Sequence, residues 1–393
     1  MGKLDLLSGN KAVAYGAKLS RVQVVSAYPI TPQTTIVEKI AAFVANGEMD
    51  TKYIKVESEH SAMAACIAAS NTGARAFTAT SSHGLLLMHE LLIWASGARL
   101  PVVMSNVCRA NGPPWSVWAD HHDAIAQRDT GWIQFYAESN QEVLDTIIQA
   151  YKVAENKKVS IPAMVMEDAF ILSHTYEPVE VYDQEVVDDF LPPYEPEYKL
   201  DPETPYGFGS LVMPDLYMEF RYKIARAMDN ARKVIKDVGK EFGEIFGRRY
   251  ELVEFYRCED ADVALIMMGS IASTAKEVVD DMRKEGKNVG LARLRVFRPF
   301  PYEEIRWLAQ RVNMIGVVDR SYTFGFGGAV FNEVRSSLYA TRTHPIIKNY
   351  IAGLGGRDIT PVVIRKIFED ALNVGEKGLD MEIEWVGLRG GRL

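Results

Sequence analysis

The sequence predicts an α/β protein with two parallel-sheet domains. Through the first half of the chain, apolar runs alternate with helical stretches, in the rhythm of a parallel sheet covered on both faces. After a long polar interval the alternation restarts near Ala261, in the order strand, helix, strand, helix, strand. Units of this order have right-handed crossovers, so the second half should form a small parallel sheet.

Apolar runs in the first half predict strands at residues 22–27, 53–56, 76–79, 102–105, 133–136 and 163–166. Helical patterns lie between them, notably at residues 34–46, 59–70, 83–95 and 142–156. Ligands of such sheets bind at the carboxyl ends of the strands. The residues that follow each predicted strand are therefore candidate site residues.

The middle of the chain differs in character from both halves. Residues 185–205 are acidic and rich in proline, which predicts an extended connector. Residues 215–246 predict one long amphipathic helix, or two. The expected division is therefore 1–184, 185–259 and 260–393. In the last part the pattern predicts strands at 263–268, 289–294 and 315–318, and helices at 273–285 and from Pro361 onward.

Composition excludes several classes of protein. A chain of 393 residues with 48% hydrophobic and 24% charged residues is typical of a globular protein of two or three domains. No stretch approaches the ~20 apolar residues of a membrane span, and the first residues lack a signal peptide, so we expect a cytoplasmic protein with no membrane contact. The net charge of −8 argues against a nucleic-acid partner, which favours a basic face.

The three cysteines, Cys66, Cys108 and Cys258, are far apart in the sequence. They predict neither a disulfide framework nor an iron–sulfur cluster, because a cluster normally needs four cysteine ligands. Cys108 precedes a candidate site residue, but packing explains all three more simply.

The first strand is followed by the turn Tyr28-Pro29-Ile30-Thr31-Pro32-Gln33. Its two prolines lack an N–H and fix φ, so the turn is stiff and holds the Thr31 hydroxyl in one place. An ordinary strand–helix turn without a ligand would have the same local pattern. A ligand-binding role gains support because two more polar clusters follow later strands.

The second cluster contains Glu57 and Glu59, where a strand leads into a helix. A carboxylate at this place interacts favourably with the helix N-terminus and can cap it. A glutamate that points from a helix start into a cleft is also a candidate for proton transfer. For Glu59 considered alone, capping is the simpler interpretation.

In the third cluster Arg109 follows an apolar strand and precedes a turn-rich loop. A guanidinium group in this position is well placed to bind a carboxylate through two hydrogen bonds. A structural ion pair with Asp120 or Asp123 would look the same in the sequence.

Other polar or glycine-rich segments favour structural roles. The pair His121-His122 lacks the spacing of a zinc helix, so it is expected to anchor a loop, and no metal site is predicted. The segment 81–84 (Ser-Ser-His-Gly) could bind an anion but more simply packs a helix against a strand. The glycine-rich segments 324–328 and 353–357 match no phosphate-binding fingerprint and predict tight turns at a domain or subunit contact.

Six segments of the chain form a recognisable set: Tyr-Pro-Ile-Thr-Pro (28–32), Val-Glu-Ser-Glu-His-Ser-Ala (56–62), Thr-Ala-Thr-Ser-Ser-His-Gly-Leu-Leu-Leu-Met-His-Glu (78–90), Gln-Arg-Asp-Thr-Gly-Trp (127–132), Arg-Pro-Phe-Pro (298–301) and Gly-Leu-Gly-Gly-Arg-Asp (353–358). Through these segments the chain resembles the α subunits of the 2-oxoacid:ferredoxin oxidoreductase family, pyruvate:ferredoxin oxidoreductases (pyruvate synthases) in particular. The resemblance implies a thiamine-diphosphate enzyme of several chains. It also implies a pyrimidine-binding type of domain first and a transketolase C-terminal type of domain second.

The partners that the resemblance implies are β, γ and δ-type subunits, assembled as a dimer of heteromers. The β chain would bind the diphosphate and its Mg²⁺, and [4Fe-4S] clusters would sit on partner chains. Coenzyme A and ferredoxin would be the other reactants. The sequence is compatible with this division, since it has no Gly-Asp-Gly diphosphate signature and too few cysteines for a cluster.

By motif position, the resemblance also implies roles for individual residues. Glu59 would hydrogen-bond N1′ of the aminopyrimidine, and Pro29 would pack against the cofactor. Thr31 and Arg109 would hold the carboxylate and keto oxygen of the 2-oxoacid. Glu59, Arg109 and Thr31 would thus be the catalytic residues. The reaction implied is the reversible oxidative decarboxylation of pyruvate to acetyl-CoA and CO₂, with electrons passed to ferredoxin.

Three alternatives stay open at this point. The substrate could be a branched-chain or aryl 2-oxoacid or 2-oxoglutarate, because Asn111-Gly112 is not the pairing expected in typical pyruvate enzymes. Thr31 argues against the oxalate-using relatives. The chain could also be a non-catalytic scaffold subunit, although the joint presence of Thr31, Glu59 and Arg109 argues against that. A transketolase-like enzyme independent of ferredoxin is the third.

Overall fold

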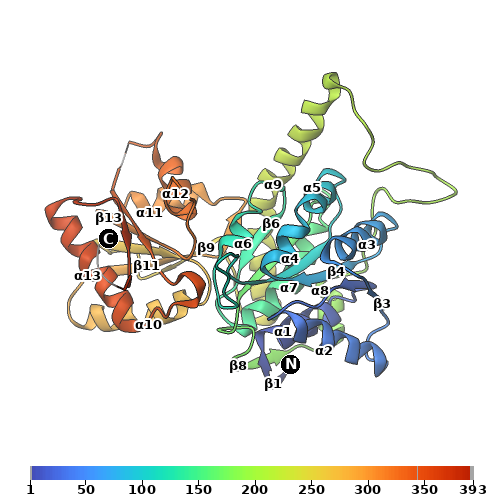
Figure 1. Ribbon diagram of the computed structural model, residues 1–393, viewed down its shortest axis with the longest axis horizontal. Coiled ribbons are helices and arrows are strands. Elements are labelled where there is room, and N and C mark those ends of the chain that lie inside the picture. Colours follow the sequence, from blue (N-terminus) through green and yellow to red (C-terminus); the bar gives the residue numbers. More distant parts are fainter. Residues whose placement is uncertain (1, 343, 390–393) are drawn as a thin grey trace.

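The computed structural model describes residues 2–342 and 344–389 of the chain. Within these ranges the strands form a seven-stranded sheet, a six-stranded sheet and a two-stranded ribbon. Figure 1 shows the two sheets in separate lobes, the first drawn from blue to green and the second from orange to red. The α/β fold class predicted from the sequence is confirmed.

The sheet of the first lobe has the order β12-β6-β7-β5-β4-β2-β3. Its parallel strands are β2 (Val24–Ala27), β3 (Lys52–Lys55), β4 (Ala76–Thr80), β5 (Val103–Cys108), β6 (Ile133–Tyr136) and β7 (Ala163–Asp168). All six correspond to predicted strands. The edge strand β12 (Val296–Arg298) pairs antiparallel with β6, so a segment from late in the chain completes the first sheet.

Helices cover both faces of this sheet. One face packs against α1 (Gly9–Leu19), α2 (Thr34–Ala45), α7 (Asn140–Ala154) and part of α9 (Pro214–Phe246). The other face packs against α3 (Glu59–Asn71), α4 (Ser82–Leu87), α5 (His89–Gly97) and α6 (His122–Ile125). The continuous helix expected at residues 83–95 is divided at Met88. Its N–H is shared between the Gly84 and Leu85 carbonyls, as in the tighter turn of a 3₁₀ helix.

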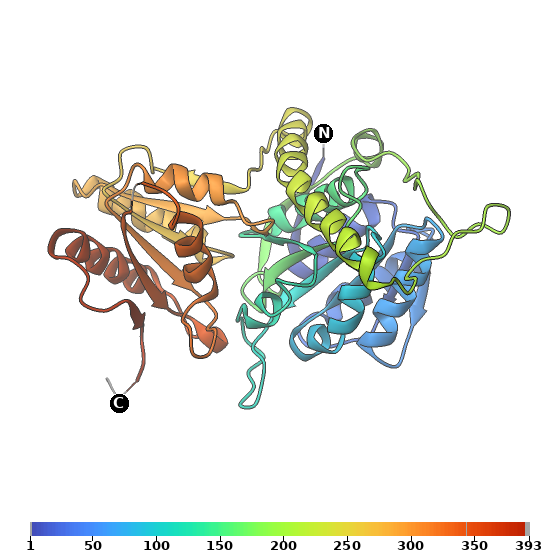
Figure 2. The same ribbon diagram turned by 90° about the horizontal axis from the view of Figure 1, so that it is seen from above.

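The polar interval between the two lobes contains structure that the sequence did not indicate. Residues 184–190 form helix α8 (Gln184–Phe190) rather than an extended connector, because Val187 and Phe190 are buried in the core of the first lobe. The ribbon of β1 (Lys3–Ser8) and β8 (Tyr176–Val181) was also not predicted. Residues 191–213 contain no helix or strand. Figures 1 and 2 show this segment projecting from the first lobe before α9 returns to it.

The second lobe is built on the sheet β15-β14-β13-β10-β11-β9. Its strands are β9 (Val253–Tyr256), β10 (Val263–Met267), β11 (Val289–Leu294), β13 (Met314–Asp319), β14 (Ile346–Ile351) and β15 (Ile383–Trp385), and all but β9 run parallel to their neighbours. One face packs against α10 (Ile271–Lys284) and α13 (Pro361–Lys377), the other against α11 (Tyr302–Ala309) and α12 (Ala329–Leu338). A short 3₁₀ turn covers Leu354–Gly356.

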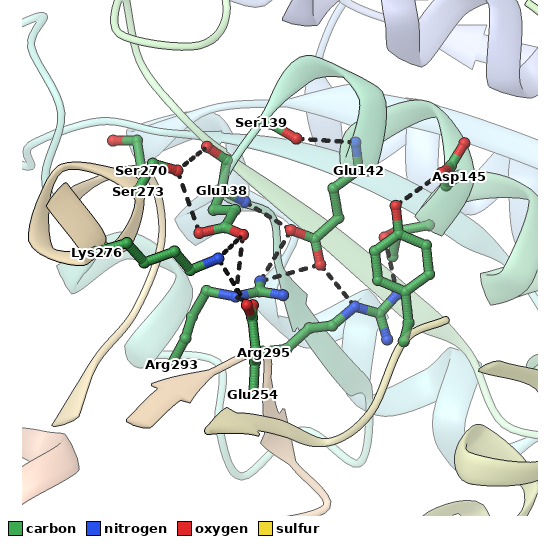
Figure 3. A network of polar contacts seen from close by, with 12 residues as sticks. Glu138, Ser139, Glu142, Asp145, Glu254, Ser270, Ser273, Lys276, Arg293 and Arg295 are labelled. Atoms are coloured by element: carbon green, nitrogen blue, oxygen red, sulfur yellow. Dashed lines mark hydrogen bonds and ion pairs between the residues drawn. The ribbon is translucent and has the colours of Figure 1, made fainter. Parts of the chain in front are cut away.

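Buried ion pairs join the two lobes. Glu142 on α7 accepts hydrogen bonds from Arg293 on β11 and from Arg295 just after it (Figure 3), at 2.8 and 2.7 Å. Burial disfavours the charged form, yet Arg293 and Arg295 hold the pKa of the Glu142 carboxyl below its usual range. Glu138 adds a bond of 2.7 Å from Lys276 of α10. These contacts tie the second lobe to the first.

Over the part of the chain that the structure describes, none of the helices combines the length and the apolar character that crossing a bilayer requires.

Candidate active site

The predicted clusters lie at one edge of the larger sheet. The turn 28–33 follows β2, Glu59 follows β3, the segment 81–84 follows β4, and Arg109 follows β5. These four strands are consecutive in the sheet order β5-β4-β2-β3 and run parallel. Their carboxyl ends therefore meet at the same edge, where a ligand of this kind of sheet binds.

Arg109 reaches from the end of β5 to the turn after β2. Its Nη1 donates to the Thr31 carbonyl oxygen over 2.6 Å, and its Nη2 lies 3.3 Å from His83 Nδ1. The residue is 5% exposed, and its Nε is buried without a hydrogen-bond partner in the structure. Burial lowers the pKa of the Arg109 guanidinium. Among residues 2–342 and 344–389 it has no ion-pair partner, so the site holds an uncompensated positive charge that an anionic ligand would stabilise.

The structural ion pair considered for Arg109 is absent from the described ranges. Asp123 instead accepts from the backbone N–H groups of Arg109 and Ser82, at 3.2 and 2.9 Å, and from Asn106 Nδ2. Asp120 accepts from the backbone N–H of Gly355. Asp123 thus positions the backbone of the site and forms no ion pair with the guanidinium. Burial raises the pKa of the Asp123 carboxyl to about 6.

Glu59 is the first residue of α3 but does not cap it. The capping residue is Ser58, whose Oγ accepts from the Ser61 N–H over 3.2 Å, so the capping interpretation of Glu59 is wrong. Glu59 is 7% exposed, and its side chain makes no hydrogen bond or ion pair to any other described residue. Its carboxyl group is therefore available to a ligand.

The position of the Glu59 carboxyl depends on the glycine at the start of α4. A Cβ added at Gly84 would lie 2.6 Å from Glu59 Oε1 and 2.5 Å from Thr80 Oγ1. Only a residue without a side chain leaves room for the carboxyl group there. The buried Thr80 hydroxyl has no hydrogen-bond partner in the structure, which leaves a second polar atom beside Glu59.

Successive contacts connect the predicted site residues, and the connected residues form a row. Arg109 contacts Thr31 and His83, and Gly84 next to His83 contacts Glu59. Pro29 is exposed in the same turn as Thr31. Glu57 is not part of this row, because it is exposed and accepts a hydrogen bond from the Ser61 hydroxyl.

The segments with predicted structural roles lie at contacts. His121 Nε2 lies 2.7 Å from an oxygen of Asp168, at the end of β7, and Asp168 also accepts from the Ser270 N–H and from Arg320 of the second lobe. This confirms the loop anchor expected at His121. Although burial opposes it, His121 and Arg320 hold the pKa of Asp168 well below its usual range. The Gly355 carbonyl accepts from Ser116, so the turn 353–357 is a contact between lobes, as predicted.

The cysteines pack in the interior. Cys66, Cys108 and Cys258 are buried. Burial raises the pKa of the Cys108 thiol well above its usual value, so this neighbour of Arg109 is not a thiolate.

Two residues of the site did not stand out in the sequence. Asp123 was considered only as an ion-pair or loop residue, and its contact with two backbone N–H groups comes from the folding of the loop after β5. His83 was treated as part of a helix start, although a histidine three residues after the end of a strand was a usable signal.

Comparisons with known proteins agree along the whole chain. Residues 15–240 match the family model "Pyruvate flavodoxin/ferredoxin oxidoreductase, thiamine diP-bdg", and residues 261–364 match "Pyruvate:ferredoxin oxidoreductase core domain II". Ketoisovalerate oxidoreductase subunit VorA of Pyrococcus horikoshii is 59% identical over 98% of both chains. Pyruvate synthase subunit PorA of Methanocaldococcus jannaschii is 53% identical over 99% of both chains.

A solved structure shares the fold. The 2-oxoglutarate:ferredoxin oxidoreductase from Magnetococcus marinus superposes with a TM-score of 0.73 at 20% identity. The match covers 94% of the present chain and 66% of the other, so the solved chain is considerably longer.

Proposed function

Because the chain belongs to the 2-oxoacid:ferredoxin oxidoreductase α-subunit family, we propose that it is the α subunit of a pyruvate:ferredoxin oxidoreductase. The complex would convert pyruvate and coenzyme A to acetyl-CoA and CO₂, pass the electrons to ferredoxin, and catalyse the reverse reaction as well. One observation carries this proposal: Arg109 and Glu59 are buried at one sheet edge, without a charged partner in the described parts of the chain.

The residues around Glu59 fit the aminopyrimidine of thiamine diphosphate. A buried carboxyl group without a partner can hydrogen-bond a ring nitrogen, and Gly84 leaves the space that the carboxyl needs. When bound, thiamine diphosphate supplies the nucleophilic carbon and the electron sink that decarboxylation of a 2-oxoacid requires. Glu59 would hold a proton at the aminopyrimidine nitrogen, and Pro29 would pack against the cofactor.

Arg109 and Thr31 would bind the substrate. A buried guanidinium with an unused Nε donor suits a carboxylate, because charge-assisted hydrogen bonds are the strongest available to such an anion. The bond from Arg109 Nη1 to the Thr31 carbonyl fixes the distance between the two residues. Holding the 2-oxoacid in one orientation relative to the cofactor would be their main contribution to the rate.

The proposed activity needs other chains. β, γ and δ-type subunits would carry the diphosphate with its Mg²⁺ and the [4Fe-4S] clusters, and ferredoxin would accept the electrons. The buried cysteines of this chain support that division, since they lie apart and none pairs with another. We propose a dimer of such heteromers.

A branched-chain 2-oxoacid is the second candidate substrate. The ketoisovalerate subunit quoted above is more similar to this chain than the pyruvate synthase subunit, at 59% against 53% identity. The loop with Asn111 and Gly112 contacts His83 and Ser82 beside Arg109, where the substrate side chain would lie. Either substrate would use Glu59 and Arg109 in the same way.

We expect the complex purified through this chain to reduce methyl viologen anaerobically when a 2-oxoacid and coenzyme A are supplied together. Glu59→Gln keeps the shape of the side chain but removes its charge, and should lower turnover by about 100-fold or more, because general acid–base groups contribute about 10²–10⁴. The neighbouring Glu57→Gln is the matched control and should keep full activity, since Glu57 is exposed.

The substrate panel includes pyruvate, 2-oxoisovalerate, an aryl 2-oxoacid and 2-oxoglutarate. The highest kcat/KM identifies the substrate and decides between the two candidates. Wild-type complex that contains thiamine diphosphate and yet reduces no acceptor with any of them would refute the proposed function.

A further inference from the structure

His83 lies between the guanidinium of Arg109 and the loop that follows it. Its Nδ1 is 3.3 Å from Arg109 Nη2, and its Nε2 is 3.1 Å from the backbone nitrogen of Gly112. Both neighbours are hydrogen-bond donors. A neutral imidazole has one N–H and one acceptor nitrogen, so only one of these contacts can be a hydrogen bond.

The geometry favours the tautomer in which Nε2 accepts from Gly112. The contact to Gly112 is the shorter, at 3.1 Å against 3.3 Å to Arg109 Nη2, and the backbone N–H of Gly112 has no other hydrogen-bond acceptor among the described residues. Arg109 Nη2 lies at the candidate site, where it can donate to a bound anion instead. In this tautomer the Nδ1–H points toward the Arg109 guanidinium, with one donor facing another. An acceptor bound at Arg109 would satisfy both of them.

The backbone just before His83 is strained. The preceding residue, Ser82, has φ of +48°, in the left-handed region that non-glycine residues rarely adopt. Contacts of both its polar groups maintain it: the Ser82 N–H donates to Asp123, and Ser82 Oγ donates to the Ala110 carbonyl over 2.7 Å and lies 3.0 Å from Asn111 Oδ1. Backbone strain that surrounding contacts over-determine is typical of functional sites.

One carboxylate sets the positions of both donors. Asp123 Oδ2 accepts from the N–H of Ser82, next to His83, and from the N–H of Arg109. His83 and Arg109 therefore keep a fixed separation even though they follow different strands. Such a pair, with Arg109 Nε also lacking an acceptor, is preorganised for one small anion.

We propose that His83 is a further substrate-binding residue, whose Nδ1–H donates to the carboxylate of the 2-oxoacid held by Arg109. This inference rests on the proposed function, because it needs a 2-oxoacid at Arg109. It adds a group that also positions the loop at residues 111–115, through the contact of Nε2 with Gly112.

Two amide variants separate the two contacts of the ring. In His83→Asn the side-chain NH₂ can take the place of Nδ1, while the contact to Gly112 is lost. In His83→Gln the side-chain oxygen can take the place of Nε2, while the donor near Arg109 is lost. Both variants are measured in the assembled complex, with His60→Gln as the control, a half-exposed residue of α3 whose ring lies 3.6 Å from Glu90.

We expect His83→Gln to raise the KM for the 2-oxoacid about 10-fold or more, as for loss of a hydrogen bond to a charged group. Its kcat should change much less, and its KM for coenzyme A not at all. His83→Asn should keep the KM for the 2-oxoacid near the wild-type value. Inhibition by oxamate, which carries the same carboxylate, should weaken in His83→Gln in parallel.

The opposite order, with His83→Asn impaired and His83→Gln normal, would show that His83 only supports the loop. Equal KM values in all variants, or equal impairment in both, would likewise overturn the inference while leaving the proposed function intact. If the wild-type complex uses no 2-oxoacid, the proposed function fails, and the role of His83 fails with it.

Discussion

At the scale of single residues, the interior of the chain contains several ionisable groups that lack a charged partner or a hydrogen-bond partner among the described residues. Arg109 and Glu59 lie at the candidate site, where ligands would compensate them. Glu167 lies near the end of β7, beside Val107 of β5 and under Gly9 at the start of α1. Both of its oxygens are buried without a hydrogen-bond partner in the structure. Burial, together with the charge of Asp168, raises the pKa of the Glu167 carboxyl to about 8.

This shift predicts a pH dependence of stability. The ordinary pKa of a glutamate is 4.5, so between that value and about 8 the folded chain keeps a proton that the unfolded chain releases. The free energy of unfolding should therefore fall as the pH rises through this window, by at most about 1.4 kcal/mol per pH unit. Glu167→Gln cannot titrate, so its stability should exceed that of the wild type increasingly from pH 5 to pH 8.

Thermal or denaturant unfolding of both variants at these two pH values provides the measurement. Other titrating groups are common to both chains and cancel in the difference. A difference between the variants that stays constant with pH would contradict the assignment.

At the scale of secondary-structure elements, the start of α4 is the most sensitive part of the site. Gly84 lies in the first turn of this helix, and the Glu59 carboxyl of α3 occupies the space above it. The two helices follow neighbouring parts of the sheet, so their starts meet at the same edge. A side chain at residue 84 would displace the Glu59 carboxyl or the Thr80 hydroxyl.

We therefore expect Gly84→Ala to lower turnover of the complex about 10-fold or more, because it displaces a group whose contribution is about 10²–10⁴. Gly97→Ala, at the end of α5, is the matched control. Among the described residues, no atom outside that helix lies within 4 Å of the added Cβ, and a helical alanine is favoured over glycine by about 1 kcal/mol. Activity and thermal unfolding are measured for both. Full activity in Gly84→Ala would show that Glu59 tolerates displacement.

At the scale of the whole molecule, buried ion pairs and a shared apolar core join the lobes. The core on the α3–α5 side of the first sheet continues into the second lobe through Ile266 and Phe297. Figure 3 shows Glu142 between Arg293 and Arg295, with Glu138 and Lys276 beside them. Replacing one member of such a network leaves the remaining charges buried and incompletely paired.

Glu142→Gln should therefore lower the free energy of unfolding by about 3–5 kcal/mol. The control is Glu241→Gln, which breaks the ion pair of 2.6 Å with Lys152. Glu241 is 43% exposed, and pairs in such positions contribute about 0–1 kcal/mol. Thermal unfolding of the purified chain gives both values. A loss for Glu142→Gln no larger than that of the control would mean that the network does not hold the lobes together.

The sequence by itself determined the fold class, the parallel strands of the first sheet and the edge at which the site residues gather. Apolar runs and helical periodicity are local patterns, and the carboxyl ends of parallel strands share an edge. The extended connector was predicted in part, since residues 191–213 contain no helix or strand. The edge strand β12 and the ribbon of β1 and β8 were not predictable, because their partners are far away in the sequence.

Only the tertiary structure decided the chemical state of the candidate site. In the sequence, Asp123 was an equally good ion-pair partner for Arg109, and Glu59 an equally good helix cap. In the folded chain Asp123 accepts from backbone N–H groups, and Ser58 caps α3. The Arg109 guanidinium and the Glu59 carboxyl are therefore left without an ion pair. Whether a charge is compensated depends on distances in space, and contacts between separate strands and loops set those distances.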